Sequence, residues 1–309
     1  MNPPTAPAIL PGVHGGDSVL RAVFYMCLAA MLFPVLNASV KYLGQRYPMP
    51  ELFWVRYAGH VFYCLLAFLP RHGLALFATR RPGVQVVRSL LLFGASACFF
   101  LALRTIDLPT ASAIAFVTPI IVTALSMPML GERVGPRRWT AVMVGFLGAL
   151  IIIRPGFQIV QWGAVLVLMD ALCYGVYQIL SRKVGSLDAA PISITLAGIG
   201  GLVCASIILP FSEIRLPHGF VDVALFLTLG LWGLLGHFFV IKAVQWGRAS
   251  IVAPVGYVEL IGATLFGWLV FHDFPDAWTW VGAAVIVVSG LYITYREHRL
   301  QRLRRRTPA

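Results

Sequence analysis

The sequence predicts an all-α membrane protein of ten transmembrane helices, arranged as two inverted five-helix repeats. Three observations predict this fold: the composition, ten apolar runs of spanning length, and a self-similarity between the two halves. Of the 309 residues, 59% are hydrophobic and 12% are charged, and the mean hydropathy is +0.83. An average soluble domain is about 45–50% apolar and about 25% charged. The composition therefore excludes an ordinary soluble enzyme, a disordered protein and a disulfide-stabilised scaffold.

The ten apolar runs account for the predicted helices in chain order. About 20 apolar residues cross the hydrocarbon core, and a backbone in lipid must satisfy its own hydrogen bonds, which favours helices. The ten-residue alternation typical of a membrane β-barrel is absent. Charges, prolines or glycines bound each run, and the runs lie at 20–41, 51–69, 86–104, 110–130, 138–154, 162–181, 191–210, 222–241, 250–271 and 277–295.

Basic residues are distributed unevenly between alternate loops. With the N-terminus placed in the cytoplasm, 18 of the 24 Lys and Arg residues fall on the cytoplasmic side and 5 on the other, while Arg56 lies within a span. By the positive-inside rule, this distribution predicts that both termini are cytoplasmic and that the number of spans is even. We expect the basic tail to contact anionic membrane lipid and, despite the net charge of +12, we expect no nucleic-acid partner.

The two halves and the polar ends give the predicted domain organisation. Residues 1–18 are rich in Pro and Gly and are expected to form a disordered cytoplasmic lead, since they lack the basic segment and cleavage site of a signal peptide. Residues 19–156 and 160–296 are the predicted five-helix repeats, and 297–309 form a basic cytoplasmic tail. The five cysteines lie inside apolar runs without metal-ligand spacing, so we expect neither a metal nor a cofactor.

The two halves align without gaps when the chain is shifted against itself by 141 residues. The matched pairs include Trp139/Trp280, Pro50/Pro191, Gly59/Gly200, Phe116/Tyr257, Asn37/Gln178 and Glu132/Asp273. Because five helices is an odd number, the second half is expected to enter the membrane inverted relative to the first. Carriers use such inverted repeats to build two mirror-related gates around one central site.

Segments 108–155 and 249–297 share a second pattern. The first contains Leu130-Gly131-Glu132 and a glycine-spotted helix that ends in Arg154-Pro155-Gly156, and the second contains Phe271-His272-Asp273, Gly282 and Gly290. On these residues the chain resembles the paired EamA modules of the drug/metabolite transporter superfamily. The resemblance implies ten helices, two repeats and transport of a small organic solute. The stretch from Arg81-Pro82-Gly83 to Glu132 is similar to the branch that contains riboflavin and S-adenosylmethionine carriers.

A polar stripe on the run at 162–181 is the first candidate for a solute site. Asp170, Tyr174 and Gln178 are four residues apart and therefore share one helix face, and Asn37 corresponds to Gln178 under the shift. We expect these side chains and Tyr257 to line a cavity for a polar, ring-containing solute. The alternative is a set of hydrogen bonds that only holds the helices together.

Further ionisable residues lie inside the spans, where a charge needs a specific reason. Arg56 and His60 are four residues apart, and they either bind an anionic group of the solute or pair internally with Asp170 or Glu259. Glu259 and Asp170 are the candidates for proton coupling, since burial raises a carboxyl pKa. The other polar residues and prolines have simpler expected roles. His237 is expected to be a buried histidine, and Glu132 and Asp273 are expected to cap helices. Lys41 either attracts the solute or reaches the membrane interface, and Pro119 and Pro254 act as hinges inside helices or line the cavity.

The predicted function is that of a secondary carrier, working by alternating access in a bacterial inner membrane. Riboflavin uptake is the first candidate activity, and an S-adenosylmethionine or amino-acid-type carrier or exporter is the alternative. A membrane-embedded enzyme is the alternative of another class, but the sequence lacks the nucleophile or paired acids near a membrane face that such an enzyme needs. No Walker motif is present, so ATP is not expected to drive transport directly. The coupling ion, the direction of transport and a homodimer are left open.

Overall fold

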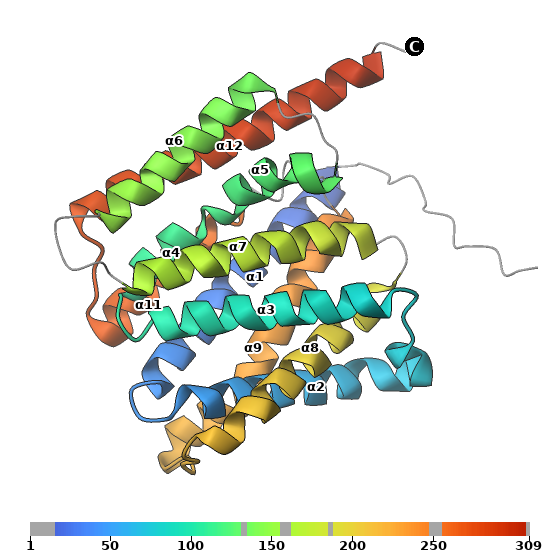
Figure 1. Ribbon diagram of the computed structural model, residues 1–309, viewed down its shortest axis with the longest axis vertical. Helices are drawn as coiled ribbons and strands as arrows, with labels where there is room; N and C mark the ends of the chain where they lie inside the picture. The colour runs from blue at the N-terminus through green and yellow to red at the C-terminus, as the bar shows by residue number, and fades with distance from the viewer. Residues whose placement is uncertain (1–15, 131–134, 155–161, 185–187, 247–254, 307–309) are drawn as a thin grey trace, which may run out of the picture.

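The computed structural model describes residues 16–130, 135–154, 162–184, 188–246 and 255–306, and within these ranges the regular structure is entirely helical (Figure 1). The first half contains α1 (Gly16–Leu43), α2 (Met49–His72), the 3-10 helix η1 (Gly73–Phe77), α3 (Pro82–Ala102), α4 (Leu108–Ala115), α5 (Thr118–Leu130) and α6 (Pro136–Ile153). The second contains α7 (Trp162–Val184), α8 (Ala190–Ile208), the 3-10 helix η2 (Leu209–Phe211), α9 (Gly219–Trp246), α11 (Val258–Phe271) and α12 (Ala277–Arg306).

Eight helical segments in the described ranges are long and apolar enough to cross a membrane. Two shorter apolar helices accompany them, Trp139–Ile153 and Val258–Phe271, which belong to the fifth and ninth predicted spans. Large apolar side chains cover the outer surface of the bundle, among them Phe62, Leu66, Ile261 and Val288, each more than half exposed. A soluble protein rarely exposes apolar surface on this scale, so the exposed side chains indicate contact with lipid tails. The chain is therefore a multi-pass membrane protein.

The fourth predicted span, 110–130, is broken into two helices. The carboxylate of Asp107 accepts a hydrogen bond from the Thr110 N–H at 2.9 Å and so caps α4, which ends at Ala115. After a turn at Phe116, α5 begins at Thr118. Pro119 therefore lies in the first turn of α5, where a missing N–H removes no intrahelical bond. Its predicted place inside a continuous helix was wrong, and the broken span explains how the chain accommodates it.

The ninth span, predicted at 250–271, has a related break. A turn at residues 256–257 precedes α11, which begins one residue later at Val258. Shifted by 141 residues, this position corresponds to the break between α4 and α5. The predicted hinge at Pro254 lies outside the described residues.

Helix packing has an approximate two-fold symmetry that exchanges the two halves. Helix α1 packs against α9 and α11, just as its counterpart α7 packs against α3 and α5. In the same way, α2 packs against α9 as α8 packs against α3. Two contacts stay the same when the halves are exchanged, because each joins a helix to its own counterpart: α6 with α12, and α2 with α8. Figure 1 shows α6 and α12 side by side at one edge of the bundle. The sequence repeat is thus also a repeat of contacts.

Two close contacts join segments that correspond to each other in the two halves. The rings of Phe116 and Tyr257, which the 141-residue shift pairs, have centroids 5.0 Å apart. In the α6–α12 contact, a Cβ on Gly148 would lie 2.9 Å from the Gly282 carbonyl oxygen, and a Cβ on Gly282 would lie 2.6 Å from the Gly148 oxygen. Small residues allow two membrane helices to approach this closely. These contacts join corresponding segments of the two halves.

Candidate functional site

Arg56 is the centre of a buried basic group between α2 and α9. Its side chain is 7% exposed and lies against two rings, with the guanidinium carbon 4.8 Å from the centroid of Tyr57 and 5.0 Å from that of Phe100. Its Nε and Nη1 have no hydrogen-bond partner among the described residues. The ion pairs of the described chain likewise do not include Arg56. The predicted internal pairing with Asp170 or Glu259 is therefore not found.

Two histidines complete this basic group. His60 is buried on the same face of α2, and its Nε2 lies 3.4 Å from the Ile194 carbonyl oxygen of α8. His237 of α9 lies near enough to His60 and Arg56 for their charges to interact, and its ring packs edge-on against Phe33 at 5.3 Å. The backbones of α2 and α9 approach closely here, because a Cβ on Gly230 would meet the backbone of Gly59 at 2.6 Å. The three side chains thus form one cluster, which we call the basic cluster.

The carboxylates Asp170 and Glu259 form a second cluster on α7 and α11. They are close enough for their charges to repel, and Tyr174 lies within the same electrostatic range. The ring of Tyr174 stacks on that of Tyr177 with centroids 5.6 Å apart. We call Asp170, Glu259 and Tyr174 the acidic cluster. The structure thus brings these candidate residues together as one group of basic side chains and one group of acidic side chains.

The remaining candidates lie on helices around these clusters. Asn37 is buried on α1, and Gln178 is half-buried one turn beyond Tyr174 on α7. Tyr257 packs against Phe116 and against Gly290 of α12. Tyr257 therefore contacts the α6–α12 side of the bundle.

One end of the bundle is closed by ion pairs. This end, which we call the ion-pair end, carries the α1–α2, α3–α4, α8–α9 and α11–α12 connections and the end of α6. Lys41 Nζ lies 2.7 Å from Asp273 Oδ2, Arg46 Nη1 lies 3.2 Å from Asp222 Oδ1, and Arg154 pairs with Asp276. Each pair joins a residue of the first half to a residue of the second.

These pairs correct two predictions. Asp273 does not cap the following helix; the cap of α12 is Asp276, whose Oδ1 accepts the Thr279 N–H at 2.8 Å. Lys41, expected either to attract the solute or to reach the membrane interface, is instead 11% exposed and is neutralised by Asp273. The predicted cap at Glu132 lies outside the described residues. Asp276 follows a proline and precedes α12 by one residue, a signal from which its capping role could have been found.

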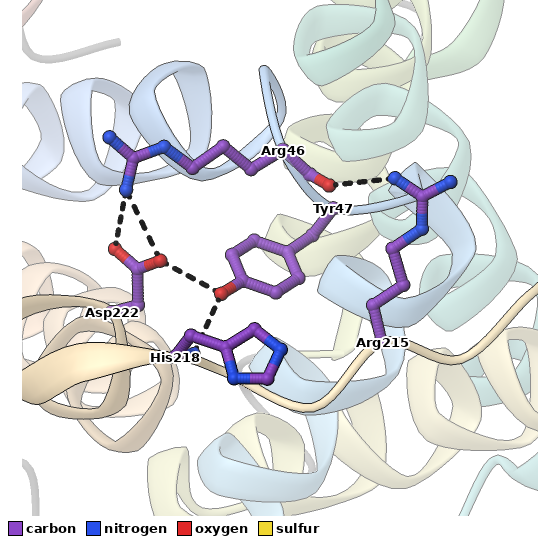
Figure 2. Close-up of a pocket in the computed structure, with 5 residues that line it drawn as sticks. All are labelled: Arg46, Tyr47, Arg215, His218 and Asp222. Atoms are coloured by element: carbon purple, nitrogen blue, oxygen red, sulfur yellow. Dashed lines mark hydrogen bonds and ion pairs between the residues drawn. The ribbon is translucent and has the colours of Figure 1, made fainter.

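A pocket of about 420 Å³ opens beside these pairs at the ion-pair end, lined by Arg46, Tyr47, Arg215, His218 and Asp222 (Figure 2). The Tyr47 hydroxyl donates to Asp222 at 2.8 Å and accepts the His218 backbone N–H at 3.0 Å. Burial raises the pKa of Tyr47, which keeps its proton available for this bond. None of the residues predicted for the solute site lines this pocket, which links the α1–α2 connection to the start of α9.

The opposite end contains a hydrogen-bond network that also crosses between the halves. The buried carboxylate of Asp188 accepts bonds from the Thr79 hydroxyl at 2.5 Å, from Gln85 Nε2 at 2.8 Å and from the Arg80 N–H at 3.2 Å. Burial works against ionisation, but the bonds from Thr79 and Gln85 prevail and lower the pKa of Asp188. The ionised carboxylate therefore holds α3 to the start of α8.

Arg88 extends this network toward α7. It is 4% exposed, donates to Gln85 and to Ser181 Oγ, and lies 5.0 Å from the ring centroid of Tyr177. Arg88 is one of the 18 basic residues that the loop distribution places on the cytoplasmic side. The spacing of Gln85, Arg88 and Ser89 within an otherwise apolar helix was the available signal for a buried polar contact.

The family model that describes EamA-like transporters matches residues 20–154 and 161–295. The chain belongs to the EamA-like transporter family. Similar proteins cover nearly its whole length. It is 31% identical over 288 residues to a riboflavin transporter of Rhizobium johnstonii, an alignment that covers 90% of this chain and 92% of the relative. It is 29% identical over 285 residues to an S-adenosylmethionine uptake transporter of Rickettsia felis, with 91% and 94% covered.

A solved crystal structure shares the architecture of this EamA-like transporter. The two align with a TM-score of 0.64 over 92% of this chain and 99% of the other, at 19% sequence identity. At that identity the likeness shows the fold alone. The family match and the similarity to named transporters make this chain a membrane transporter of a small-molecule solute.

Proposed function

We propose that this transporter is a secondary carrier that works by alternating access in a bacterial inner membrane, with ten membrane crossings in two inverted repeats. The observation that carries the proposal is the approximate two-fold packing of the halves, in which α1 meets α9 as α7 meets α3. Five crossings in each half, an odd number, would invert one repeat relative to the other. Such pseudo-symmetry lets one set of contacts close on one side while its counterpart opens on the other.

The excess of basic residues on alternate loops supports cytoplasmic termini and an extracytoplasmic position for the ion-pair end. In this arrangement residues 19–156 and 160–296 are the two repeats, and the ends at 1–18 and 297–309 lie in the cytoplasm. Labelling of a tag at each terminus in intact and permeabilised cells tests it. Labelling of either tag in intact cells contradicts the proposed topology.

Riboflavin is the first candidate solute. Its support comes from the similarity to a riboflavin transporter over nearly the whole chain and from the stacked rings of Tyr174 and Tyr177, which can face a planar heterocycle. In this proposal Asn37, Tyr174, Gln178 and Tyr257 contact the solute by hydrogen bonds or ring stacking. Glu259 and Asp170 carry the coupling proton.

S-adenosylmethionine or an amino-acid-type metabolite is the second candidate. Two opposite charge clusters favour it, since such solutes carry both a cationic group and a carboxylate. The similarity to an S-adenosylmethionine uptake transporter adds support. In this version the acidic cluster faces the cation, while Arg56 and His60 face the carboxylate.

Counterflow in proteoliposomes tests the function. Vesicles preloaded with unlabelled riboflavin are expected to accumulate labelled riboflavin transiently, whereas vesicles loaded with S-adenosylmethionine report the second candidate. Protein-free vesicles give the background. Accumulation with S-adenosylmethionine alone would replace the first candidate by the second, and accumulation with neither solute would refute both.

A further inference from the structure

Arg56 holds a charge that the described part of the protein leaves without a counter-ion. A guanidinium keeps its proton at any physiological pH, so Arg56 cannot avoid the free-energy cost of a buried charge by becoming neutral. Its side chain is 7% exposed, Nε and Nη1 lack hydrogen-bond partners, and no carboxylate pairs with it among the described residues. An uncompensated charge at this depth is costly, so its retention calls for a partner from outside the chain.

Other arginines show how this protein compensates such a charge. Arg88 is equally buried but donates to Gln85 and Ser181. Arg46 and Arg154 each face a carboxylate. Arg56 has aromatic faces in place of these partners, and rings do not accept the in-plane N–H bonds of a guanidinium.

The surroundings of Arg56 favour an anion over a neutral acceptor. The titratable groups beside Arg56 include Tyr57, His60 and His237, and the two histidines can only add positive charge. Across from Arg56, Gly233 of α9 packs beside the guanidinium, since a Cβ on it would lie 3.8 Å from Nε and 3.9 Å from Nη2. The acidic cluster, on α7 and α11, forms no ion pair with it.

We infer that Arg56 is the anchor of an anion-binding subsite on the transport path, which takes a carboxylate or phosphate group. The guanidinium fork suits an oxyanion because two N–H donors can meet two oxygens at once. The group is carried by the solute or supplied as a free anion beside a neutral solute such as riboflavin. The inference rests on the proposed carrier function only for the identity of that solute.

The first experiment measures anion binding without transport. The thermal unfolding of the full-length protein in nanodiscs is followed while acetate or inorganic phosphate is titrated at constant ionic strength. A ligand that binds only the folded state raises Tm. We expect both anions to raise the Tm of the unmodified protein, to raise that of R56K less, and not to raise that of R56Q.

A matched control separates the subsite from a general charge effect. Arg104→Gln removes an equal charge from an exposed arginine and should leave the anion response unchanged. R56Q also removes an uncompensated buried charge, so its Tm without added anion should equal or exceed that of the unmodified protein. An equal anion response in the unmodified protein and R56Q would overturn the inference.

A second measurement identifies the source of the anion by means of matched ligands. Riboflavin and flavin mononucleotide differ by a phosphate, and S-adenosylmethionine differs from its decarboxylated form by a carboxylate. If the solute carries the anion, the charged member of a pair should bind about tenfold more tightly, and R56Q should lose that preference. If members of each pair bind equally while acetate or phosphate still raises Tm, the anion comes from solution. Failure of counterflow with both candidate solutes would refute the proposed solutes, whereas the Tm response would still report the subsite.

Discussion

Asp170 and Glu259 come from the same half of the chain but from different helices, α7 and α11, and lie within electrostatic range of each other. Two neighbouring carboxylates in a low-dielectric site rarely ionise together, so one proton is readily shared or exchanged. Such a pair suits a carrier that couples a proton to its solute. Because the basic cluster lies elsewhere, no ion pair within the described chain removes this repulsion.

Replacing Glu259 by Gln tests this role. We expect uptake driven by a pH gradient to fall by about tenfold, which is a typical size for the coupling between two linked binding sites. Counterflow without a gradient should be retained. The measurement compares the two assays in proteoliposomes, and Asp170→Asn should reduce both if Asp170 also contacts the solute. Glu213→Gln, which removes a carboxylate whose side chain is 76% exposed, is the control. Unchanged gradient-driven uptake in E259Q would contradict the coupling role.

The sequence indicated which ionisable residues lie inside spans, but not which of them meet. Depth follows from position along a helix, so Arg56, His60, Asp170 and Glu259 could be singled out. Pairing depends on how helices rotate and pack, and the hydrophobic pattern of a span apolar on all sides carries little information about rotation. For this reason Lys41 could not be assigned its partner Asp273, and the cluster of Arg56 with His237 was missed.

At the scale of helices, the α6–α12 contact depends on glycine. A Cβ on Gly282 would overlap Ile152 and would lie 2.6 Å from the Gly148 oxygen, whereas a Cβ on Gly83, in the first turn of α3, would meet no atom within 4 Å. Overpacking of this kind costs about 1–3 kcal/mol. Gly282→Ala should therefore lower Tm in detergent, while Gly83→Ala should leave it unchanged or raise it slightly. Equal Tm values for the two variants would contradict the close packing.

The Asp188 network gives α3 and α8 a pH-dependent connection. The pKa of Asp188 is lower in the folded protein than its usual value, so the ionised carboxylate contributes stability above a pH of about 4 and this contribution is lost as the pH falls through the lower folded pKa. Asp188→Asn should lower Tm at pH 7, and the difference from the unmodified protein should shrink toward pH 3. Thermal unfolding across this range measures it. A difference that is independent of pH would show that the charge is unimportant.

Helix positions were largely predictable, because length and hydropathy determine them, but helix breaks were not. The run at 110–130 is apolar throughout, and only Pro119 signals the break that separates α4 from α5. Proline is compatible with either a kink or a helix start, and the capping of α4 and the turn at Phe116 decided between them. The break before α11 has no proline at the equivalent position.

At the scale of the whole molecule, we predict that the ion pairs at the ion-pair end hold the two halves together on that side. Asp273→Asn leaves Lys41 without its carboxylate, so the end should open more often and the interior should become more accessible from that side. The reporter is Cys98, a half-buried native thiol in electrostatic range of Asp170, and its labelling by an impermeant reagent is measured by mass spectrometry. We expect faster labelling in D273N than in the unmodified protein.

The pair of Arg215 with Glu213 supplies the control for this experiment, since both residues belong to the second half. Glu213→Gln removes an ion pair at the same end without separating the halves and should leave Cys98 labelling unchanged. Equal acceleration by both variants would attribute the effect to local charge rather than to gating.

The ring contact between Phe116 and Tyr257 has a consequence for how such a molecule could move. Phe116 and Tyr257 occupy corresponding places in the two repeats. If the repeats exchange their conformations, each ring takes the place of the other and the contact between them is kept. In the proposed cycle, an ion pair such as Lys41 with Asp273 joins residues that do not correspond to each other and would break in one of the two states. In the proposed transport cycle, the contact between the two rings is therefore kept in both states, and the two halves rotate about it.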